Sequence, residues 1–367
     1  MILLFLLAGA LVYSMLSVVA AVRYLAASTP NDVADPEPIS VLKPLAGLDK
    51  GLEENLRGFF EQDYPQFELL FAVRQETDPC VPLVRRMCAE HARIPSRLIL
   101  TGEPPYPHAK VYSLARMLAD SQHELIVMSD SDIRVTPDFL RHVAAEFAGG
   151  ATALATCPYR ALPGHSFWSR LEAAGMNTTF WQGVLTARIL EGMKFAVGPT
   201  TVARRKAIDS IGGIERVKNY LAEDFELGKL IAEAGFRVIL SSYVVEHHIG
   251  SETRTANFRH RIRWARTTRR SRPWGYFGQL FTYPLPLALL LVAAMPRWWP
   301  LLASTVVIRY ASALFVSQVV LGARLDWALL PLEDLLGFAF WIAGFFGNSI
   351  TWRGRTYRLD REGRAVV

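Results

Sequence analysis

The sequence predicts an α/β domain with a mostly parallel sheet, held at a membrane by apolar segments on both sides. Between residues 39 and 128, short apolar stretches alternate with helix-like patterns, which is typical of a parallel sheet with helices on both faces. Of the 367 residues, 51% are hydrophobic, and the mean hydropathy is +0.18. Both values are high for a soluble enzyme, so membrane segments are expected.

The first apolar segment is expected to be an uncleaved anchor. Residues 1–22 are almost wholly apolar and long enough to cross a bilayer, and Arg23 follows them. A cleaved signal peptide is the alternative, but this run is too long for one, and no basic residue precedes it. By the positive-inside rule, the domain after the anchor (residues 1–27) should face the cytosol. The three cysteines, an odd number, fit that reducing compartment.

The elements follow in order along the chain. Residues 28–38, rich in Pro, Asp and Asn, are expected to be a linker, and residues 39–272 the cytosolic domain. Within that domain the apolar patterns predict strands at 39–42, 67–74, 97–100 and 125–128, and helices at 51–62, 82–91, 111–120 and 223–234. Across residues 273–350, apolar stretches flanked by Trp predict membrane segments at 280–295, 300–321 and 329–350.

The tail, residues 351–367, carries five arginines against two acidic residues. Positive charge favours the cytosolic side, whereas three complete crossings would place the tail outside. Asp326, Glu333 and Asp334 are also costly in lipid. We therefore expect that residues 329–350 do not cross fully and that the tail returns beside Arg263 and Trp264.

A pair of carboxylates marks the expected site. Asp130 and Asp132 directly follow the apolar stretch 125–128, and open α/β sheets bind their ligands at the carboxyl ends of the strands. Carboxylates there suit Mg²⁺ or Mn²⁺, which often share their ligands with substrate phosphates. The pattern predicts transfer from a nucleotide-activated donor, although acidic pairs also end many strands without binding metal.

Two further groups of charged residues lie later in the chain. Glu223 and Asp224 open the predicted helix 223–234; they are either an ordinary acidic first turn or a general base for an acceptor hydroxyl. Between residues 259 and 272 the chain is densely basic, which suits anionic headgroups. Within that run, Arg263 beside Trp264 also suits a diphosphate. A net charge of +6 beside apolar spans favours a membrane over nucleic acid.

Taken in this order, the motifs resemble those of the processive family 2 glycosyltransferases and, more closely, family 21, the ceramide glucosyltransferases. The resemblance covers nearly the whole chain. It rests on SVLKPLAGLD at 40–49, FFEQDYP at 59–65, SDSDIRV at 129–135, AEDF at 222–225, IRW at 262–264 and ITWRGRTYR at 350–358. It implies a GT-A type nucleotide-sugar-binding fold and transfer of one hexose, with inversion, from a UDP-sugar to the primary hydroxyl of a membrane lipid.

The resemblance also implies roles for individual residues. The family's second signature Asp matches Asp130, its catalytic-base Asp matches Asp224, and its Arg-Trp pair matches Arg263 and Trp264. Glu223 adjoins the base and is expected to act with it. Asp130 and Asp132 are expected to hold the divalent cation on the diphosphate.

Other assignments to the donor rest on position within the motifs. The first signature Asp matches Asp78, with Gln75 or Glu76 as alternatives if the alignment slips. The family commonly has Gln or Arg where this chain has His260. Lys43 with the adjoining Pro44, and Lys110, fall where such enzymes contact the nucleotide, although either lysine could equally be a solvated surface residue.

The resemblance leaves the substrates open. UDP-glucose and ceramide are the expected pair; a UDP-sugar such as UDP-GlcNAc and a hopanoid polyol are the alternative, because glycosyltransferases of bacterial hopanoid synthesis are also similar along the chain. The Trp- and Phe-rich stretch at 167–194 is either a buried core helix or a lipid groove. A polysaccharide synthase would need more spans, and a non-catalytic membrane scaffold is the remaining alternative.

Overall fold

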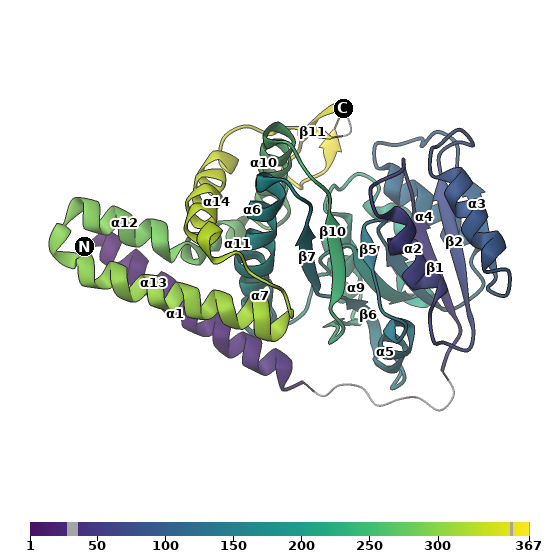
Figure 1. The fold of residues 1–367 in the computed structure, drawn as a ribbon, viewed down its shortest axis with the longest axis horizontal. Helices are drawn as coiled ribbons and strands as arrows, with labels where there is room; N and C mark the ends of the chain where they lie inside the picture. The colour runs from purple at the N-terminus through teal and green to yellow at the C-terminus, as the bar shows by residue number, and fades with distance from the viewer. Residues whose placement is uncertain (28–35, 353–354, 367) are drawn as a thin grey trace. The chain divides into compact units, whose positions relative to one another are not determined.

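The chain is described from a computed structural model, which covers residues 1–27, 36–352 and 355–366 (Figure 1). Most of the predicted linker, and Arg353 and Gly354 of the tail motif, lie outside the described residues. The chain forms two compact units. We call Thr29–Tyr159 with Met193–His248 the sheet unit, and Met1–Ser28 with Arg160–Gly192 and Ile249–Val367 the helical unit.

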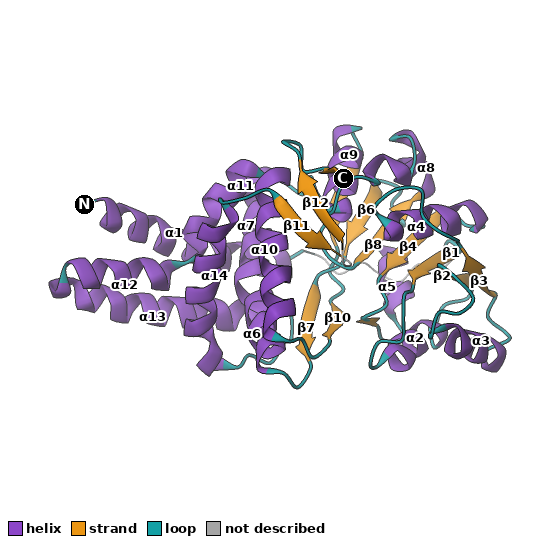
Figure 2. Ribbon diagram, turned by 90° about the horizontal axis from the view of Figure 1, so that it is seen from above, coloured by secondary structure: helices purple, strands orange, loops and turns teal. Residues whose placement is uncertain are grey.

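The sheet unit is built on a sheet whose described strands number seven, in the order β3-β2-β1-β4-β8-β6-β9 (Figure 2). Neighbouring strands run parallel except at β8, which is antiparallel to both β4 and β6. The predicted α/β fold with a mostly parallel sheet is thus confirmed. The strands are β1 (Ile39–Pro44), β2 (Phe67–Val73), β3 (Ser96–Leu100), β4 (Leu125–Ser129), β6 (Thr152–Thr156), β8 (Thr200–Arg204) and β9 (Arg237–Leu240).

Helices cover both faces of this sheet. Every residue of β2 is buried: Leu70 packs in a cluster with Leu114 of α4, whereas the next residue, Phe71, stacks on Phe60 of α2 at 5.7 Å between ring centroids. Alternate side chains of one strand therefore pack against opposite layers, which explains its unbroken apolar sequence. The helices are α2 (Leu52–Phe60), α3 (Val81–Glu90), α4 (Ala109–Asp120), α5 (Phe139–Ala145), α8 (Arg205–Ser210) and α9 (Glu223–Glu233).

The predicted strands and helices of this unit match the observed ones to within two residues at each end. The strands β6, β8 and β9 were not predicted, nor was the short antiparallel pair of β5 (Ile133–Arg134) with β10 (Val245–Ile249). The pair matters for the site because β5 directly follows Asp132.

The helical unit is organised around the N-terminal helix α1. Leu7 and Ala10 of α1 pack against Leu287 and Leu291 of α12. Trp181 of α7 is fully buried, which favours the core-helix interpretation of this part of the 167–194 stretch. The helices are α1 (Ile2–Leu25), α6 (Phe167–Gly175), α7 (Trp181–Glu191), α10 (Arg254–Ser271), α11 (Pro273–Gly278), α12 (Pro284–Ala294), α13 (Trp299–Leu314) and α14 (Leu330–Gly344); the strand β7 (Tyr159–Pro163) precedes α6.

Among the described residues, three helical segments are long and apolar enough to cross a membrane: Ile2–Leu25, Pro296–Val320 and Trp327–Gly344. A fourth passes that test only as a pair, Pro273–Thr282 with Pro284–Ala294, which bends by 62°. The bend lies at Tyr283, because a residue before proline is disfavoured in helical conformation and Pro284 has no N–H to continue the ladder. The segment predicted at 280–295 is therefore one arm of a broken helix.

The acidic residues predicted to be costly in lipid are paired. Asp334 is fully buried and accepts two hydrogen bonds from Arg309, at 2.8 Å from Nε and 2.7 Å from Nη2. Glu333 accepts two from Arg261 of α10, at 2.8 and 2.7 Å. These pairs determine which face of α14 is turned toward Arg261 and Arg309, because removal of one partner of a buried pair typically costs about 3–5 kcal/mol.

The tail folds back onto α10 as strands β11 (Ser349–Trp352), β12 (Arg355–Leu359) and β13 (Ala365–Val366). Arg269 donates to the carbonyls of Phe345 and Gly347 at 3.1 and 2.9 Å, and Arg266 donates to that of Phe346 at 3.1 Å. These contacts place residues 345–347, directly before β11, against Arg266 and Arg269 of α10. The expected position of the tail beside Arg263 and Trp264 stays a prediction. Because α10 precedes the apolar helices and the tail follows them, we predict that the chain between them crosses a membrane an even number of times.

A labelling experiment tests this topology. We expect single cysteines at Thr255 of α10 and at Glu362 of the tail, both exposed, to react with an impermeant thiol reagent from the same side of sealed vesicles. Cys80, Cys88 and Cys157 are replaced by Ser in this background, and labelling after detergent treatment is the control for accessibility. Labelling of the two cysteines from opposite sides would contradict the even number of crossings.

Candidate active site

Parallel pairing brings the ends of β1 and β4 together. Val41 is in register with Val127, so Pro44 ends β1 near the start of the Asp130–Asp132 turn. That turn is held by backbone contacts: Asp130 N donates to the carbonyl of Pro199 at 2.9 Å, and Asn55 Nδ2 donates to that of Ser131 at 3.2 Å. The predicted position of the two carboxylates at a strand's carboxyl end is therefore seen in the structure.

Lys43 supports this turn from inside the fold. Its side chain is fully buried, so the alternative of a solvated surface lysine is wrong. Its ammonium donates to the carbonyl of Asp130 and to Ser129 Oγ, at 2.5 and 3.3 Å, and lies 4.0 Å from the centroid of the Phe59 ring. Burial lowers the pKa of Lys43 to about 7.

Lys110 joins two elements of the site. Its ammonium lies 2.6 Å from Asp130 Oδ1 and 2.7 Å from Glu223 Oε1, so α4 links the β4 turn to the start of α9. Burial would lower the pKa of Lys110, but the two carboxylates hold it above its ordinary value. Only about a fifth of the side chain is exposed, so Lys110 is not a solvated surface lysine either.

Glu223 also faces His108, at 3.2 Å. Burial opposes ionisation of Glu223, yet Lys110 and His108 hold its pKa well below the usual range. Glu223 is thus a fixed negative charge beside Asp224.

Asp224 occupies the first turn of α9. Its Oδ2 accepts a hydrogen bond from Gly198 N at 2.7 Å, and its Oδ1 accepts one from Phe225 N at 2.8 Å. Burial and the neighbouring charge of Glu223 raise the pKa of Asp224 to about 7. Near neutral pH this carboxylate can accept a proton, as a general base must.

A glycine allows α9 to lie this close to the Gly198 segment. A Cβ on Gly228, one turn after Asp224, would lie 2.1 Å from the backbone nitrogen of Ala196. No side chain fits there, and the close approach brings the first turn of α9 within hydrogen-bond reach of Gly198.

Asp132 has one carboxylate oxygen that pairs with a histidine and one that receives no hydrogen bond from the described residues. His247 Nε2 lies 3.1 Å from Asp132 Oδ2; although burial raises the pKa of Asp132, the facing His247 holds it below the ordinary value. Its other oxygen, Oδ1, is buried and receives no hydrogen bond from the described residues. A free carboxylate oxygen beside Asp130 fits the hard divalent cation expected from the sequence.

Asp78 has a different environment from the other predicted donor residues. Its carboxylate accepts hydrogen bonds from Gly47 N at 3.0 and 3.1 Å and from Cys80 N at 3.1 Å. Gly47 has a φ of +76°, so the carboxylate fixes a tight turn after β1. These bonds hold the pKa of Asp78 low against the effect of burial.

The remaining predicted residues, His260, Arg263 and Trp264, lie on α10 in the helical unit. The imidazole of His260 lies 4.6 Å from the Trp264 ring, and its Nδ1 is 2.7 Å from Glu172 Oε1. Their role in donor binding stays a prediction from the motif.

Three residues near the carboxylates of Asp132 and Glu223 were not predicted from the sequence: His108, His247 and Asp49. Burial and the charge of Asp132 raise the pKa of Asp49. His108 stands two positions before Lys110, and Asp49 closes the SVLKPLAGLD motif, so both lay within quoted segments. His247 is brought to Asp132 by the pairing of β10 with β5, and no sequence spacing indicates that.

Known proteins resemble this chain at several levels. Ceramide glucosyltransferase 1 of Caenorhabditis elegans is 28% identical over 239 residues, which are 63% of this chain and 50% of the relative. Ceramide glucosyltransferase 3 of the same organism is 26% identical over 230 residues, 62% of this chain and 50% of the relative. The chain thus spans about half the length of the curated relatives it matches.

Among solved structures, a mannosyltransferase from Pyrobaculum calidifontis in complex with GDP-Man and Mn²⁺ aligns with a TM-score of 0.57 at 20% identity, over 94% of this chain and 96% of that one. This likeness shows the predicted GT-A type fold. The family described as Glycosyl transferase family 21 matches residues 2–365. The chain therefore belongs to glycosyl transferase family 21, as its motifs predicted.

Proposed function

We propose that the protein transfers one hexose, with inversion, from a UDP-sugar to the primary hydroxyl of a membrane lipid, with UDP-glucose and ceramide as the substrates. The observation that carries the proposal is the placement of Asp224, a carboxylate of raised pKa, on a helix whose first turn is tied through Glu223 and Lys110 to Asp130. The names of the curated relatives support the lipid and the sugar.

In this mechanism Asp224 accepts the proton of the lipid hydroxyl while the hydroxyl oxygen attacks the anomeric carbon. The bond from that carbon to the diphosphate breaks, so UDP leaves with the bonding electron pair from the opposite face of the sugar. Asp130 and Asp132 would hold a divalent cation, which when bound supplies positive charge for the diphosphate. Lys110 holds Asp130 and Glu223 in place and favours the ionised form of each.

The apolar segments support a membrane enzyme. We infer that the sheet unit faces the cytosol, where UDP-sugars would reach the ends of β1 and β4. Asp78, Pro44 and Lys43 are proposed to shape the donor side through the turns they hold. His260, Arg263 and Trp264 are proposed, from the motif alone, to contact the donor.

Product analysis tests the substrates. We expect the full chain in lipid nanodiscs to form glucosylceramide from UDP-glucose and ceramide, identified by mass spectrometry, with ceramide-free nanodiscs as the control. If a product forms only with UDP-GlcNAc and a hopanoid polyol, these two compounds replace UDP-glucose and ceramide as the proposed substrates. If neither lipid class supports UDP release and no glycolipid forms, the protein is a non-catalytic scaffold and the proposed transfer is refuted.

Substitution of the base should abolish turnover without abolishing donor binding. We expect Asp224→Asn to lower kcat by about 10²- to 10⁴-fold, because an amide keeps the shape but cannot accept a proton. In the parent, activity should fall as pH drops below about 7, since the protonated carboxyl is no base. UDP-sugar binding by calorimetry is measured beside turnover, with the exposed Asp209→Asn as the matched control. Near-parental turnover would remove Asp224 from this role.

The cation makes a separate prediction. We expect excess EDTA to abolish transfer and Mn²⁺ or Mg²⁺ to restore it, because carboxylates beside a diphosphate otherwise repel it. Asp132→Asn should raise the Mn²⁺ concentration needed for half-maximal activity by at least about tenfold, whereas the exposed Asp63→Asn should leave it unchanged. Full activity in EDTA would assign charge neutralisation to side chains alone.

A further inference from the structure

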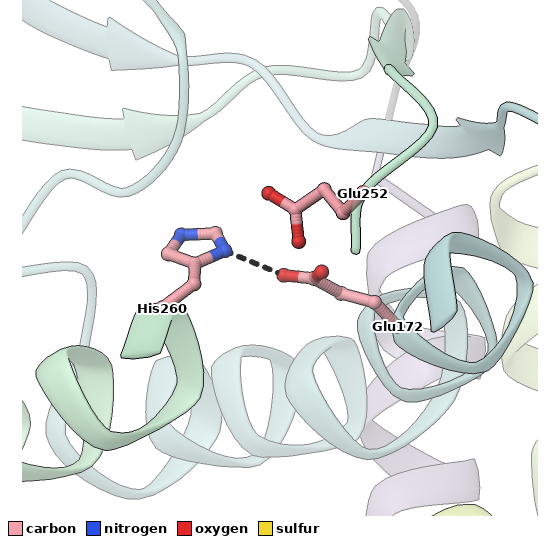
Figure 3. Close-up of side chains that lie close together, drawn as sticks. All are labelled: Glu172, Glu252 and His260. Atoms are coloured by element: carbon pink, nitrogen blue, oxygen red, sulfur yellow. Dashed lines mark ion pairs between the residues drawn. The ribbon is translucent and has the colours of Figure 1, made fainter. Parts of the chain in front are cut away.

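The helical unit contains a second group of side chains of the types that bind metal ions. Its residues are separate in the sequence from the carboxylates of the sheet unit. Figure 3 shows Glu172 of α6, Glu252 of the segment before α10 and His260 of α10 directed toward one another. One ligand atom from each lies within 4.8 Å of the other two. Side chains from α6 and from the stretch around the start of α10 thus meet at one point.

The atoms at this point lack hydrogen-bond partners. Glu172 is 5% exposed, and its Oε1 receives no hydrogen bond from the described residues; the same holds for Glu252 Oε2 and for His260 Nδ1. Oε1 of Glu172 and Nδ1 of His260 are 2.7 Å apart as an ion pair, without the alignment of an N–H···O bond. Three potential ligand atoms that gather at one point without well-aligned hydrogen bonds are arranged as the ligands of a shared ion are.

The charge of the cluster is also incomplete. Two carboxylates face a single imidazole, and Arg261, the next residue on α10, already donates both its Nη groups to Glu333 at 2.8 and 2.7 Å. The other oxygen of Glu172 accepts from the neutral amide of Asn257, at 2.6 Å. A divalent cation would balance both carboxylates and leave the imidazole neutral, the form that ligates metals.

The distances suit a small ion. With bonds of about 2.0 to 2.2 Å, ligand atoms around a four- or six-coordinate ion lie roughly 3 to 4.4 Å apart. The ligand atoms lie within 4.8 Å of one another, and Glu172 Oε1 and His260 Nδ1 are 2.7 Å apart, so small side-chain shifts would bring the three to such distances. One nitrogen and two carboxylate ligands favour a first-row transition metal over Mg²⁺, with Zn²⁺ bound more tightly than Mn²⁺.

We propose that Glu172, Glu252 and His260 bind a divalent transition-metal ion, Zn²⁺ in preference to Mn²⁺, that ties α6 to α10. Asn257 is fully buried, and its amide donates to Glu172 Oε2 and so orients the carboxylate toward the ion. The ion would fix His260, and through the 4.6 Å contact of the two rings the orientation of Trp264. Its test measures metal binding alone, so the outcome does not depend on the proposed transfer reaction.

Metal binding to the full chain tests the site. The parent protein carries Asp130→Asn and Asp132→Asn to remove the proposed donor cation site, and Cys88→Ser to remove a partly exposed thiol. After dialysis against Zn²⁺ without nucleotide, we expect one bound Zn²⁺ per chain by elemental analysis and a rise in Tm. Glu252→Gln and His260→Gln should each weaken Zn²⁺ binding by more than about tenfold, and Asn257→Ala by about 10- to 100-fold.

Matched controls are Glu191→Gln, whose carboxylate pairs with Arg272 in the same unit, and the exposed His165→Gln. Both should bind Zn²⁺ as the parent does, and Mg²⁺ should not compete. The Tm measurement on the parent needs no ligand variant, so the proposal stays testable if a variant does not fold. No Zn²⁺ binding by the parent, or parental binding after Glu252→Gln and His260→Gln, would overturn the site and indicate instead a proton shared between the carboxylates.

Discussion

The candidate active site depends on the ion pairs that Lys110 forms with Asp130 and Glu223. Asp130 follows the fourth strand, whereas Glu223 starts a helix more than ninety residues later in the chain. One ammonium between them fixes the distance from the turn that would hold the donor to the helix that carries Asp224, the proposed base. The ammonium also keeps the carboxylates of Asp130, Glu223 and Asp224 close together, although their mutual repulsion would otherwise separate them.

The same ion pairs divide the roles of two adjacent carboxylates. Lys110 and His108 stabilise the ionised form of Glu223, and the charge of Glu223 in turn destabilises ionised Asp224. Neighbours in sequence thereby acquire pKa values on opposite sides of their ordinary range. Glu223 serves as a permanent countercharge, and Asp224 remains able to exchange a proton near neutral pH.

Local patterns were sufficient to predict the strands β1 to β4, their helices and the positions of Asp130 and Asp224, because each depends on apolar periodicity or on a contiguous motif. The strand β8 was not predictable in this way: its antiparallel direction is decided by its neighbours β4 and β6. His247 reaches Asp132 only through the pairing of β10 with β5. Lys43 is a charged residue that the sequence alone does not predict to be buried. It is buried because Ser129 Oγ and the carbonyl of Asp130 accept hydrogen bonds from its ammonium. The break at Tyr283 had a local signal in Pro284, which the length of the apolar run obscured.

The close approach of α9 to Ala196 limits which residues can replace Gly228. The position contacts no substrate in the proposed mechanism, but any side chain there would push α9 away from Ala196. That displacement would separate Asp224 from Gly198 and change the solvation on which its proton affinity depends. Packing and acid–base chemistry are therefore coupled at this position. A side chain at Gly228 would require a new path for residues 195–198, and without that change the folded protein would hold Asp224, the proposed base, out of place.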